Sequence, residues 1–330
     1  MLTRWLLPVL GLVLALTAGR TMAADDAWPT KPLTIVVATG AGGGFDLMAR
    51  MTAPLLGQQL GVPVAVINKE GGSELIGSAY LLSQPHDGNT MLIVGSVPYW
   101  YADINEFHAP FKLGDFDVLN IQSEDRSALM VPKDSRFKSA KDLLTELKAH
   151  PGTPSGAVVR SSGEFYNLGI MRESLGLPPS AIRVVTYESS APLRSALAGS
   201  QVDFAVISLD ASASIMQLLK PLAIFGPPDK EFPGLPSVES VLKPMGAKVP
   251  EFVPSSYRAF VVPADFKTLY PDRYKKLLHA YQTVVQSPEL IQKAAAASLP
   301  ALWIGPDKSR QEIDHAFALL QKHENLLTEK

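Results

Sequence analysis

The sequence predicts an exported α/β protein whose two lobes, each built on a mostly parallel sheet, enclose a central ligand cleft. Strand-like apolar runs alternate with helix-like segments in both halves of the chain, as in β-α-β units. Glycine- and serine-rich turns join several of these strands to the helices that follow, and open parallel sheets bind ligands beyond the carboxyl ends of their strands. The length of 330 residues, less a leader, suits about two domains.

Residues 1–23 have the features of a secretory signal peptide. Arg4 gives a positively charged start, and the apolar residues 5–18 form a stretch too short to span a bilayer comfortably. Thr21 and Ala23 place small residues at the cleavage positions, so we expect the mature chain to begin directly after them. The alternative is an uncleaved membrane anchor, which would need a longer apolar run or a basic stop-transfer flank. We therefore expect a periplasmic protein.

The composition excludes several classes of protein. The chain has no cysteine, which rules out disulfides, thiolate nucleophiles, cysteine metal sites and a lipid-modified cysteine. Its formal net charge of −2 at pH 7 gives no basic excess for nucleic acid or for an anionic membrane surface. We expect a monomer that floats free and binds no nucleic acid.

The first lobe, residues 24–127 plus 258–330, begins with a β-α-β-α-β series. Apolar runs predict its strands, and apolar residues at helical spacing, such as Leu47, Met51 and Leu55, predict its helices. The elements are strands 33–38, 62–67 and 90–94, a helix that starts near Asp46, and a helix over 74–82. The later helices, near 271–286, 288–297 and 308–327, are expected to return to this lobe.

The second lobe, residues 128–257, repeats the alternation. The predicted strands are 128–132, 156–159, 183–186 and 202–207, and the predicted helices are 138–150, 164–175 and 192–198. Residues 227–254 are rich in proline and glycine, which indicates irregular surface chain. We expect the strands at 128–132 and 258–263 to cross between the lobes, and two crossings can act as a hinge.

A run of three glycines, Gly42, Gly43 and Gly44, lies between the first predicted strand and its helix. Without side chains, its backbone N–H groups lie open at a helix N-terminus, where partial positive charge collects. The alternative is a tight turn that only glycine can form. The strand before it and the helix after it favour an anion site, and neutral donors would let a delivery protein release a carboxylate more readily than a charge-assisted pair would.

Residues beside this turn are further candidate ligand contacts. Asp46 is predicted to cap the helix rather than to touch the ligand, because its carboxylate would repel an anion. Phe45 is either a packing residue or a wall against an apolar ligand body. Ser73 and Glu74 either cap the next helix or line the cleft as donors, and Glu74 could instead receive a cationic group.

The second lobe is expected to supply the opposite wall of the cleft. The best candidates for donors there are three residues that precede a helix, Ser161, Ser162 and Gly163. Tyr187 and Ser208 lie at strand ends and could add hydroxyl donors, whereas Asp210 is predicted to be a solvated loop residue. Ser96, after the third strand of the first lobe, completes the candidate set.

Short motifs along the chain resemble, in order, those of one known family. They are W-P-T-K-P from Trp28, G-G-G-F-D from Gly42, N-K-E-G from Asn68, D-G-N-T from Asp87, S-Q-V-D from Ser200 and L-P-S-V from Leu235. Each motif is weak alone. Their order and spacing across most of the chain resemble the periplasmic solute receptors of tripartite tricarboxylate transporters.

The resemblance implies a type II periplasmic binding fold that closes on a small carboxylate and delivers it to membrane permease subunits. In that family, backbone amides and ordered water hold most of the carboxylate. The sequence departs from the family pattern near the ligand, because Phe45 replaces a threonine, Leu75 an asparagine, Glu188 a lysine and Ile207 an acidic residue. Phe45 is the basis for a further hypothesis, that the ligand is a larger or more apolar acid such as an aromatic carboxylate.

Motifs for catalysis fail in detail. The glycine run lacks the third glycine of the dinucleotide fingerprint, whose position holds Phe45, and it lacks a phosphate-loop lysine. Ser135 and Lys138 spell S-x-x-K without its partner motifs, and the histidines form no H-E-x-x-H. We expect no enzyme activity, no cofactor and no metal. Two alternatives stay open: a periplasmic sensor subunit of the same fold, and a hydrolase or isomerase, which the missing nucleophile and base disfavour.

Overall fold

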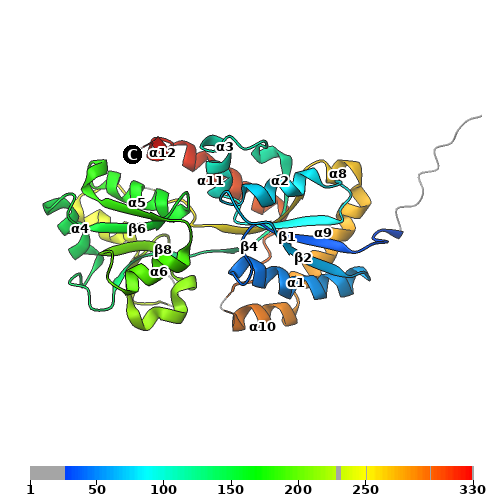
Figure 1. Cartoon of the computed structure of the whole chain (residues 1–330), viewed down its shortest axis with the longest axis horizontal. Coiled ribbons are helices and arrows are strands. Elements are labelled where there is room, and N and C mark those ends of the chain that lie inside the picture. The colour runs from blue at the N-terminus through cyan, green and yellow to red at the C-terminus, as the bar shows by residue number, and fades with distance from the viewer. Residues whose placement is uncertain (1–26, 228–231, 250, 298, 329–330) are drawn as a thin grey trace, which may run out of the picture.

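The chain folds into two lobes, and each lobe has a five-stranded sheet with helices on its faces. The computed structural model describes residues 27–227, 232–249, 251–297 and 299–328. The predicted signal peptide, residues 1–23, lies outside the described residues. Figure 1 shows the lobes side by side along the long axis of the molecule.

The sheet of lobe 1 has the strand order β2-β1-β3-β10-β4. Strands β1 (Leu33–Val37), β2 (Val64–Asn68) and β3 (Thr90–Val94) are parallel, and β10 (Tyr257–Pro263) runs antiparallel between β3 and β4 (Phe116–Glu124). The apolar runs predicted β1, β2 and β3 to within two residues. The sheet is mixed because the chain returns from lobe 2 through β10.

The sheet of lobe 2 has the order β7-β6-β8-β5-β9. Its strands are β5 (Ser127–Pro132), β6 (Ser155–Val159), β7 (Arg183–Tyr187), β8 (Phe204–Ser208) and β9 (Leu219–Ile224). Strands β6, β7 and β8 are parallel, whereas β5 runs antiparallel to β8 and β9. The sequence predicted four of these strands and missed β9.

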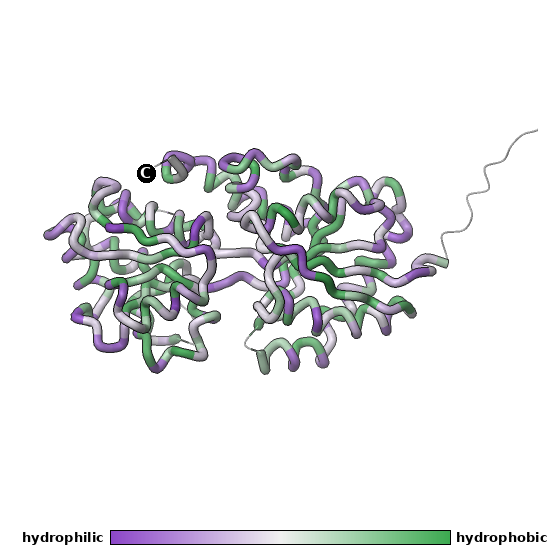
Figure 2. Tube along the Cα trace, viewed as in Figure 1, coloured by the Kyte–Doolittle hydropathy of each residue, from purple (hydrophilic) through white to green (hydrophobic). Residues whose placement is uncertain are grey.

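Helices cover both faces of each sheet, so each lobe has two apolar layers. In β1, Ile35 and Val37 pack on one face and Val36 on the other, as the alternation of a strand requires. Figure 2 shows hydrophobic residues inside both lobes and hydrophilic residues outside. The lobe 1 helices are α1 (Gly44–Leu60), α2 (Leu75–Ser83), α3 (Tyr99–Asn105), α8 (Phe266–Leu269), α9 (Pro271–Val285), α10 (Pro288–Ala296) and α11 (Pro306–Gln321), and the lobe 2 helices are α4 (Ala140–Ala149), α5 (Gly163–Ser174), α6 (Ser190–Ala198) and α7 (Val238–Leu242).

The chain crosses between the lobes twice. The first crossing is Asp125 and Arg126, which separate β4 from β5. The second crossing leads into β10 and runs beside the first, because the N–H of Asp125 donates to the carbonyl of Ser256 at 3.1 Å. Two adjacent short crossings are the arrangement of a hinge.

The end of the chain forms a third link between the lobes. Helix α12 (Asn325–Thr328) lies over α5 in Figure 1, although the sequence predicted that the last helices return to lobe 1. Leu326 is buried against Gly169 of α5, where a Cβ atom would lie 2.8 Å from the leucine side chain. The Asn325 amide donates to Glu173 of α5 at 2.8 Å. The contact of α12 with α5 therefore connects the end of the lobe 1 helices to lobe 2.

One buried carboxyl group in lobe 1 makes stability depend on pH. Asp103 of α3 is fully buried, and neither carboxyl oxygen has a hydrogen-bond partner among the described residues. Burial raises the pKa of Asp103 to about 8. In the unfolded chain this group titrates near pH 4, so between about pH 4 and 8 the folded protein binds the extra proton. Its contribution therefore lowers stability as pH rises through that window.

We expect Asp103→Asn to remove part of this pH dependence. The amide keeps the shape of the protonated acid, so the variant should unfold at a higher temperature than the parent at pH 8 and at a similar temperature at pH 5. The slope removed is at most about 1.4 kcal/mol per pH unit. Thermal unfolding between pH 5 and 8 measures it, with the exposed Asp272→Asn as control. Parallel curves for Asp103→Asn and the parent would contradict the assignment.

Candidate functional site

A cavity of about 980 Å³ lies between the lobes, a size that suits a small molecule. From lobe 1 it is lined by the turn after β1, the loop before α2 and residues at the hinge. From lobe 2 it is lined by residues that follow β6, β7 and β8, including the start of α6. The cavity thus lies beyond the carboxyl ends of parallel strands in both lobes, as expected for open sheets.

The glycine turn presents the N-terminus of α1 to this cavity. Gly42 has a φ of 81°, a left-handed conformation that glycine adopts without steric cost. Gly43 is the N-cap residue and has no side chain to bond the first helical N–H groups, which lack partners within the helix. Gly42, Gly43, Gly44 and Phe45 all line the cavity. The N–H groups that begin α1 therefore have no capping side chain and lie beside a helix dipole.

Asp46 holds this turn from behind rather than lining the cavity. Its carboxylate is buried and accepts from the N–H of Gly42 at 2.9 Å, from Arg50 Nε at 2.9 Å and from Asn68 Nδ2 at 3.0 Å. The hydrogen bond from Arg50 lowers the pKa of Asp46 to about 2, against the effect of burial. The prediction that it caps the amides of its own helix was wrong in detail, because it bonds an N–H that precedes the helix.

The loop before α2 supplies Ser73 and Glu74. Both have left-handed backbones, with φ of 53° and 83°, which cost energy for residues other than glycine and recur at functional sites. Both line the cavity. The N–H of Gly95 donates to Glu74 Oε2 at 2.6 Å, and burial raises the pKa of Glu74 to about 8. A side chain at Gly95 would displace this carboxyl group, since a Cβ would lie 2.8 Å from Oε1.

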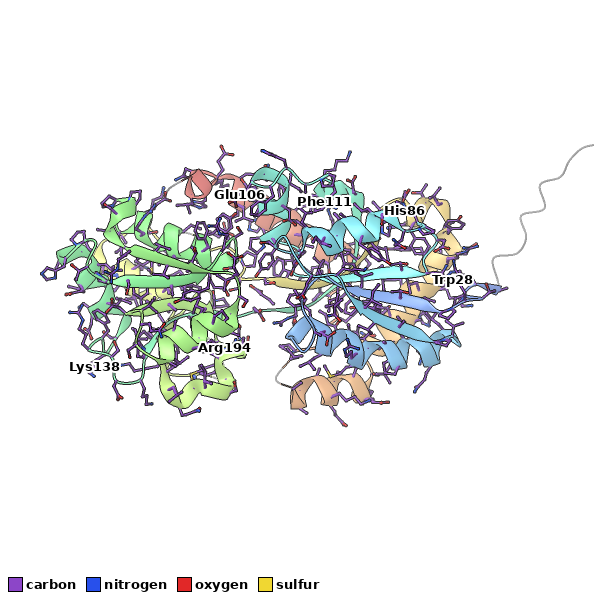
Figure 3. The ribbon with its side chains drawn as sticks, in the orientation of Figure 1. Trp28, His86, Glu106, Phe111, Lys138 and Arg194 are labelled. Carbon is purple, nitrogen blue, oxygen red and sulfur yellow. The ribbon has the colours of Figure 1, made fainter. Side chains whose placement is uncertain are left out.

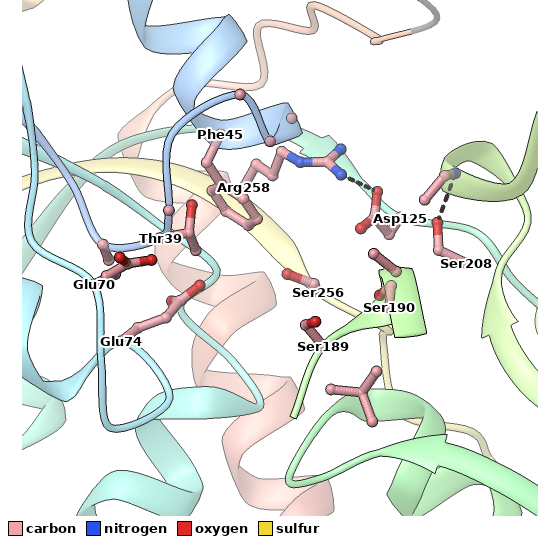
Figure 4. A pocket seen from close by; sticks show the side chains of 18 of the residues that line it. Thr39, Phe45, Glu70, Glu74, Asp125, Ser189, Ser190, Ser208, Ser256 and Arg258 are labelled. Carbon is pink, nitrogen blue, oxygen red and sulfur yellow. Dashed lines mark hydrogen bonds and ion pairs between the residues drawn. The ribbon is translucent and has the colours of Figure 1, made fainter. Parts of the chain in front are cut away.

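An arginine at the hinge, which the sequence did not single out, forms the floor of the cavity (Figure 4). Arg258 Nη2 lies 2.5 Å from Asp125 Oδ1, and Nη1 donates to Ser123 Oγ at 3.2 Å. The guanidinium also lies 5.1 Å from the ring centre of Phe45, a cation–π contact. Phe45 therefore both packs against the core and faces the cavity. The charge of Arg258 is already matched by Asp125.

The wall from lobe 2 centres on the start of α6. Ser189 is its N-cap residue and makes no side-chain capping bond, and Ser189, Ser190 and Ala191 line the cavity. Arg194, one turn further along α6, also lines it, and Figure 3 labels its position. It is half-buried, burial lowers its pKa, and within the described residues it has no hydrogen bond or ion pair. Ser189 and Ser190 at the start of α6 are the sequence signal from which this part of the cavity could have been predicted.

Ser208 is the one predicted lobe 2 contact that lines the cavity, and its hydroxyl accepts from the N–H of Ala211 at 3.1 Å. Asp210 also lines it and pairs with Arg126, so it is not the solvated loop residue that we expected. In the described parts of the chain, no cluster of three histidine, aspartate or glutamate side chains could hold a metal ion.

Five other predicted contacts are not among the residues that line the cavity. Ser96 is fully buried and donates to the carbonyl of Tyr257 at 3.2 Å. Ser161 donates to Glu106 at 3.3 Å, and Ser162 caps α5 by accepting from Phe165 at 3.3 Å. The remaining two are Gly163, whose Cβ would lie 2.2 Å from the carbonyl of Pro254, and Tyr187 at the end of β7. Their contact with ligand stays a prediction, and in this structure they shape the loops around the site.

Two α/β lobes, a hinge of two crossings and a polar cavity between them define a two-lobed solute-binding receptor. The model of the tripartite tricarboxylate transporter family receptor matches residues 48–306. The chain belongs to this family, which is one of periplasmic solute-binding receptors and not of enzymes. None of the helices in the described ranges is long and apolar enough to cross a membrane.

Relatives and solved structures agree with this assignment. The chain is 25% identical over 311 residues to the protein BugT of Bordetella pertussis, covering 92% of both chains. The structure of Rpa4515 from R. palustris with adipate has a TM-score of 0.72 at 22% identity and covers 91% of this chain and 98% of that one. MatC from Rhodopseudomonas palustris with bound malate has a TM-score of 0.67 at 17% identity and covers 88% and 99%. These structures confirm the type II periplasmic binding fold.

Proposed function

We propose that this chain captures a small carboxylate in the periplasm and delivers it to the membrane permease subunits of a tripartite transporter. It acts as a monomer, without turnover, after removal of residues 1–23. One observation carries the proposal: the N-terminus of α1, bare of side chains over Gly42–Gly44, faces a cavity between two hinged lobes. The adipate and malate in two structures of the same fold support a carboxylate as the ligand.

Capture would follow from donors on two lobes that meet at one ligand. The start of α1 supplies backbone N–H groups from lobe 1, and the start of α6 supplies N–H and hydroxyl groups from lobe 2. A carboxylate bound by one lobe gains the second set only when the lobes approach, so affinity depends on closure. Opening of the hinge then releases the ligand.

Two of the arginines that line the cavity, Arg258 and Arg194, play different parts in this proposal. Arg258 is paired with Asp125 and keeps the hinge in place, so it leaves the ligand to the neutral donors. Arg194 lies on lobe 2. When the lobes close, it can add a charge-assisted hydrogen bond to the ligand. The ligand is therefore held by amides first and by one cation second.

A screen of ligands by thermal shift tests the proposal. We expect one or more acids among di- and tricarboxylates, aromatic acids and amino acids to raise the unfolding temperature. At about 100 times its Kd, a ligand stabilises the protein by ~2.7 kcal/mol, which gives a clear shift. Neutral sugars and simple amines serve as controls. Shifts with sugars or amines and none with any acid would refute carboxylate binding.

A further inference from the structure

We infer that the ligand carries a cationic nitrogen in addition to its carboxylate, and that the side chains of Glu74 and Glu164 receive this nitrogen from the two lobes. The inference rests on the proposed function and narrows its substrate class to zwitterionic acids. Glu74 belongs to the loop before α2 in lobe 1, and Glu164 to the first turn of α5 in lobe 2. Both line the cavity.

The cavity has more acidic than basic side chains in its lining. Its lining has three arginines and twice as many acidic side chains, Glu70, Glu74, Asp125, Glu164, Glu188 and Asp210. Asp125 pairs with Arg258, and Asp210 pairs with Arg126 from outside the lining. Four glutamates are left against Arg194 and Arg160, and Arg160 itself lies 3.9 Å from Glu106. A positive group on the ligand would supply a counter-charge for those glutamates that ionise when it binds.

Glu74 and Glu164 differ from the other two glutamates because they are buried. Glu74 is 5% exposed and Glu164 is 8% exposed, whereas Glu70 and Glu188 are exposed to solvent. Within the described residues, neither Glu74 nor Glu164 forms an ion pair with a basic side chain. Glu74 Oε2 takes the N–H of Gly95, and no residue of the described chain donates to Oε1. Glu164 has hydrogen bonds from Ser162 and from its own backbone N–H. Buried carboxyl groups are normally paired with a charge as well, and a cation on the ligand can supply that partner for both acids.

The charges around the two acids are consistent with a missing cation. Besides burial, Asp103 of α3 raises the pKa of Glu74, and Asp125 at the hinge raises that of Glu164. Arg258 opposes both shifts but is bound to Asp125. The pKa reaches about 8 for Glu74 and about 7 for Glu164, so both acids hold protons near neutral pH when no cation lies beside them. Besides burial, both acids raise the pKa of Tyr99, which lines the same cavity.

Because both acids are protonated, the number of protons released or taken up on binding shows whether the ligand carries a cation. A ligand cation favours the ionised carboxylates, so binding at pH 7 should release protons. Affinity should rise with pH until both glutamates are ionised in the free protein, near pH 8, and should fall above the pKa of the ligand nitrogen. A ligand without a cation would instead take hydrogen bonds from the protonated acids. Its binding would then take up protons or leave their number unchanged, and its affinity would fall as pH rises.

Titration calorimetry with matched pairs of acids tests the inference. The pairs succinate and aspartate, glutarate and glutamate, and butyrate and 4-aminobutyrate each differ by one amino group. We expect the amino member of at least one pair to bind ten-fold or more tightly than its partner, with proton release in buffers of different ionisation enthalpy. Glu74→Gln and Glu164→Gln should each remove most of that preference, and the exposed Glu289→Gln on α10 should leave it intact.

The possible results separate the inference from the proposed function. Equal or tighter binding of the amine-free acids, or proton uptake by the amino acids, would overturn the inference and leave carboxylate capture standing. If no acid of either kind binds, the proposed function fails as well. Circular dichroism checks that each glutamine variant folds. The two glutamates lie on different lobes. If one glutamine variant fails to fold, the other still tests the preference for the amino acid.

Discussion

Replacing Gly42 with valine is expected to weaken carboxylate binding about 100-fold. Gly42 has a φ of 81°, and a β-branched side chain is strongly disfavoured in that conformation. The turn must change its shape to accept valine, and the N–H groups at the start of α1 then no longer converge. Two charge-assisted hydrogen bonds of about 1.5 kcal/mol each would be lost, which accounts for the factor of about 100. Calorimetry with the tightest acid from the ligand screen measures it.

Gly61 provides a matched control for this variant at the other end of the same helix. It is the C-cap residue of α1, has a φ of 73°, and like Gly42 has nothing within 4 Å of a built Cβ. Gly61→Val should therefore lower stability by a similar amount but bind ligand as the parent does. Unchanged affinity in Gly42→Val, or an equal loss in Gly61→Val, would show that the turn is architectural.

Arg258→Met is expected to destabilise the folded protein by about 3 kcal/mol. The arginine side chain is 7% exposed and that of Asp125 is 13% exposed, so the methionine variant leaves a mostly buried carboxylate without its counter-charge. The variant also loses the hydrogen bond to Ser123 and the contact with the ring of Phe45. Denaturant unfolding measures the change in the free energy of unfolding.

A double variant and a surface control complete this test. Arg258→Met with Asp125→Asn should recover most of the loss, because the second change removes the orphaned charge. Lys293→Gln breaks an ion pair whose side chains are 49% and 55% exposed, so it should cost under about 1 kcal/mol. If the double variant is no more stable than Arg258→Met, the pair does not act as a unit at the hinge.

The sequence allowed most of the apolar strands to be predicted, but it missed β4 as well as β9. In β4, Asn120, Gln122 and Ser123 are fully buried, so the strand lacks a continuous apolar run. Asn120 bonds the carbonyl of Leu302 at 2.8 Å, and Gln122 accepts from the hydroxyl of Tyr281 at 3.0 Å. These partners lie more than 150 residues along the chain, so no local pattern indicates that the polar side chains are satisfied inside the protein.

In the candidate site too, local sequence predicted some residues but not those that depend on contacts between distant segments. The glycine turn, Ser73 and Glu74 were predictable because a loop before a helix is readable in a few adjacent residues. Arg258 and Asp125 were not, because each is a single charged residue in its own segment and they meet only where the two crossings run together. Arg194 gave no signal either, since its place beside the cavity depends on how α6 packs in lobe 2.

The placement of α12 restricts how the molecule can change shape. Both crossings and the contact of Leu326 with α5 tie the lobes together, and Figure 1 shows α12 and α5 on one side, with α6 and α10 on the opposite side. A rigid rotation displaces each point in proportion to its distance from the axis. If the axis stays near these three ties, the parts of each lobe that lie far from it travel furthest, while the surface over α12 hardly alters. That surface would therefore look alike in an empty and a loaded molecule.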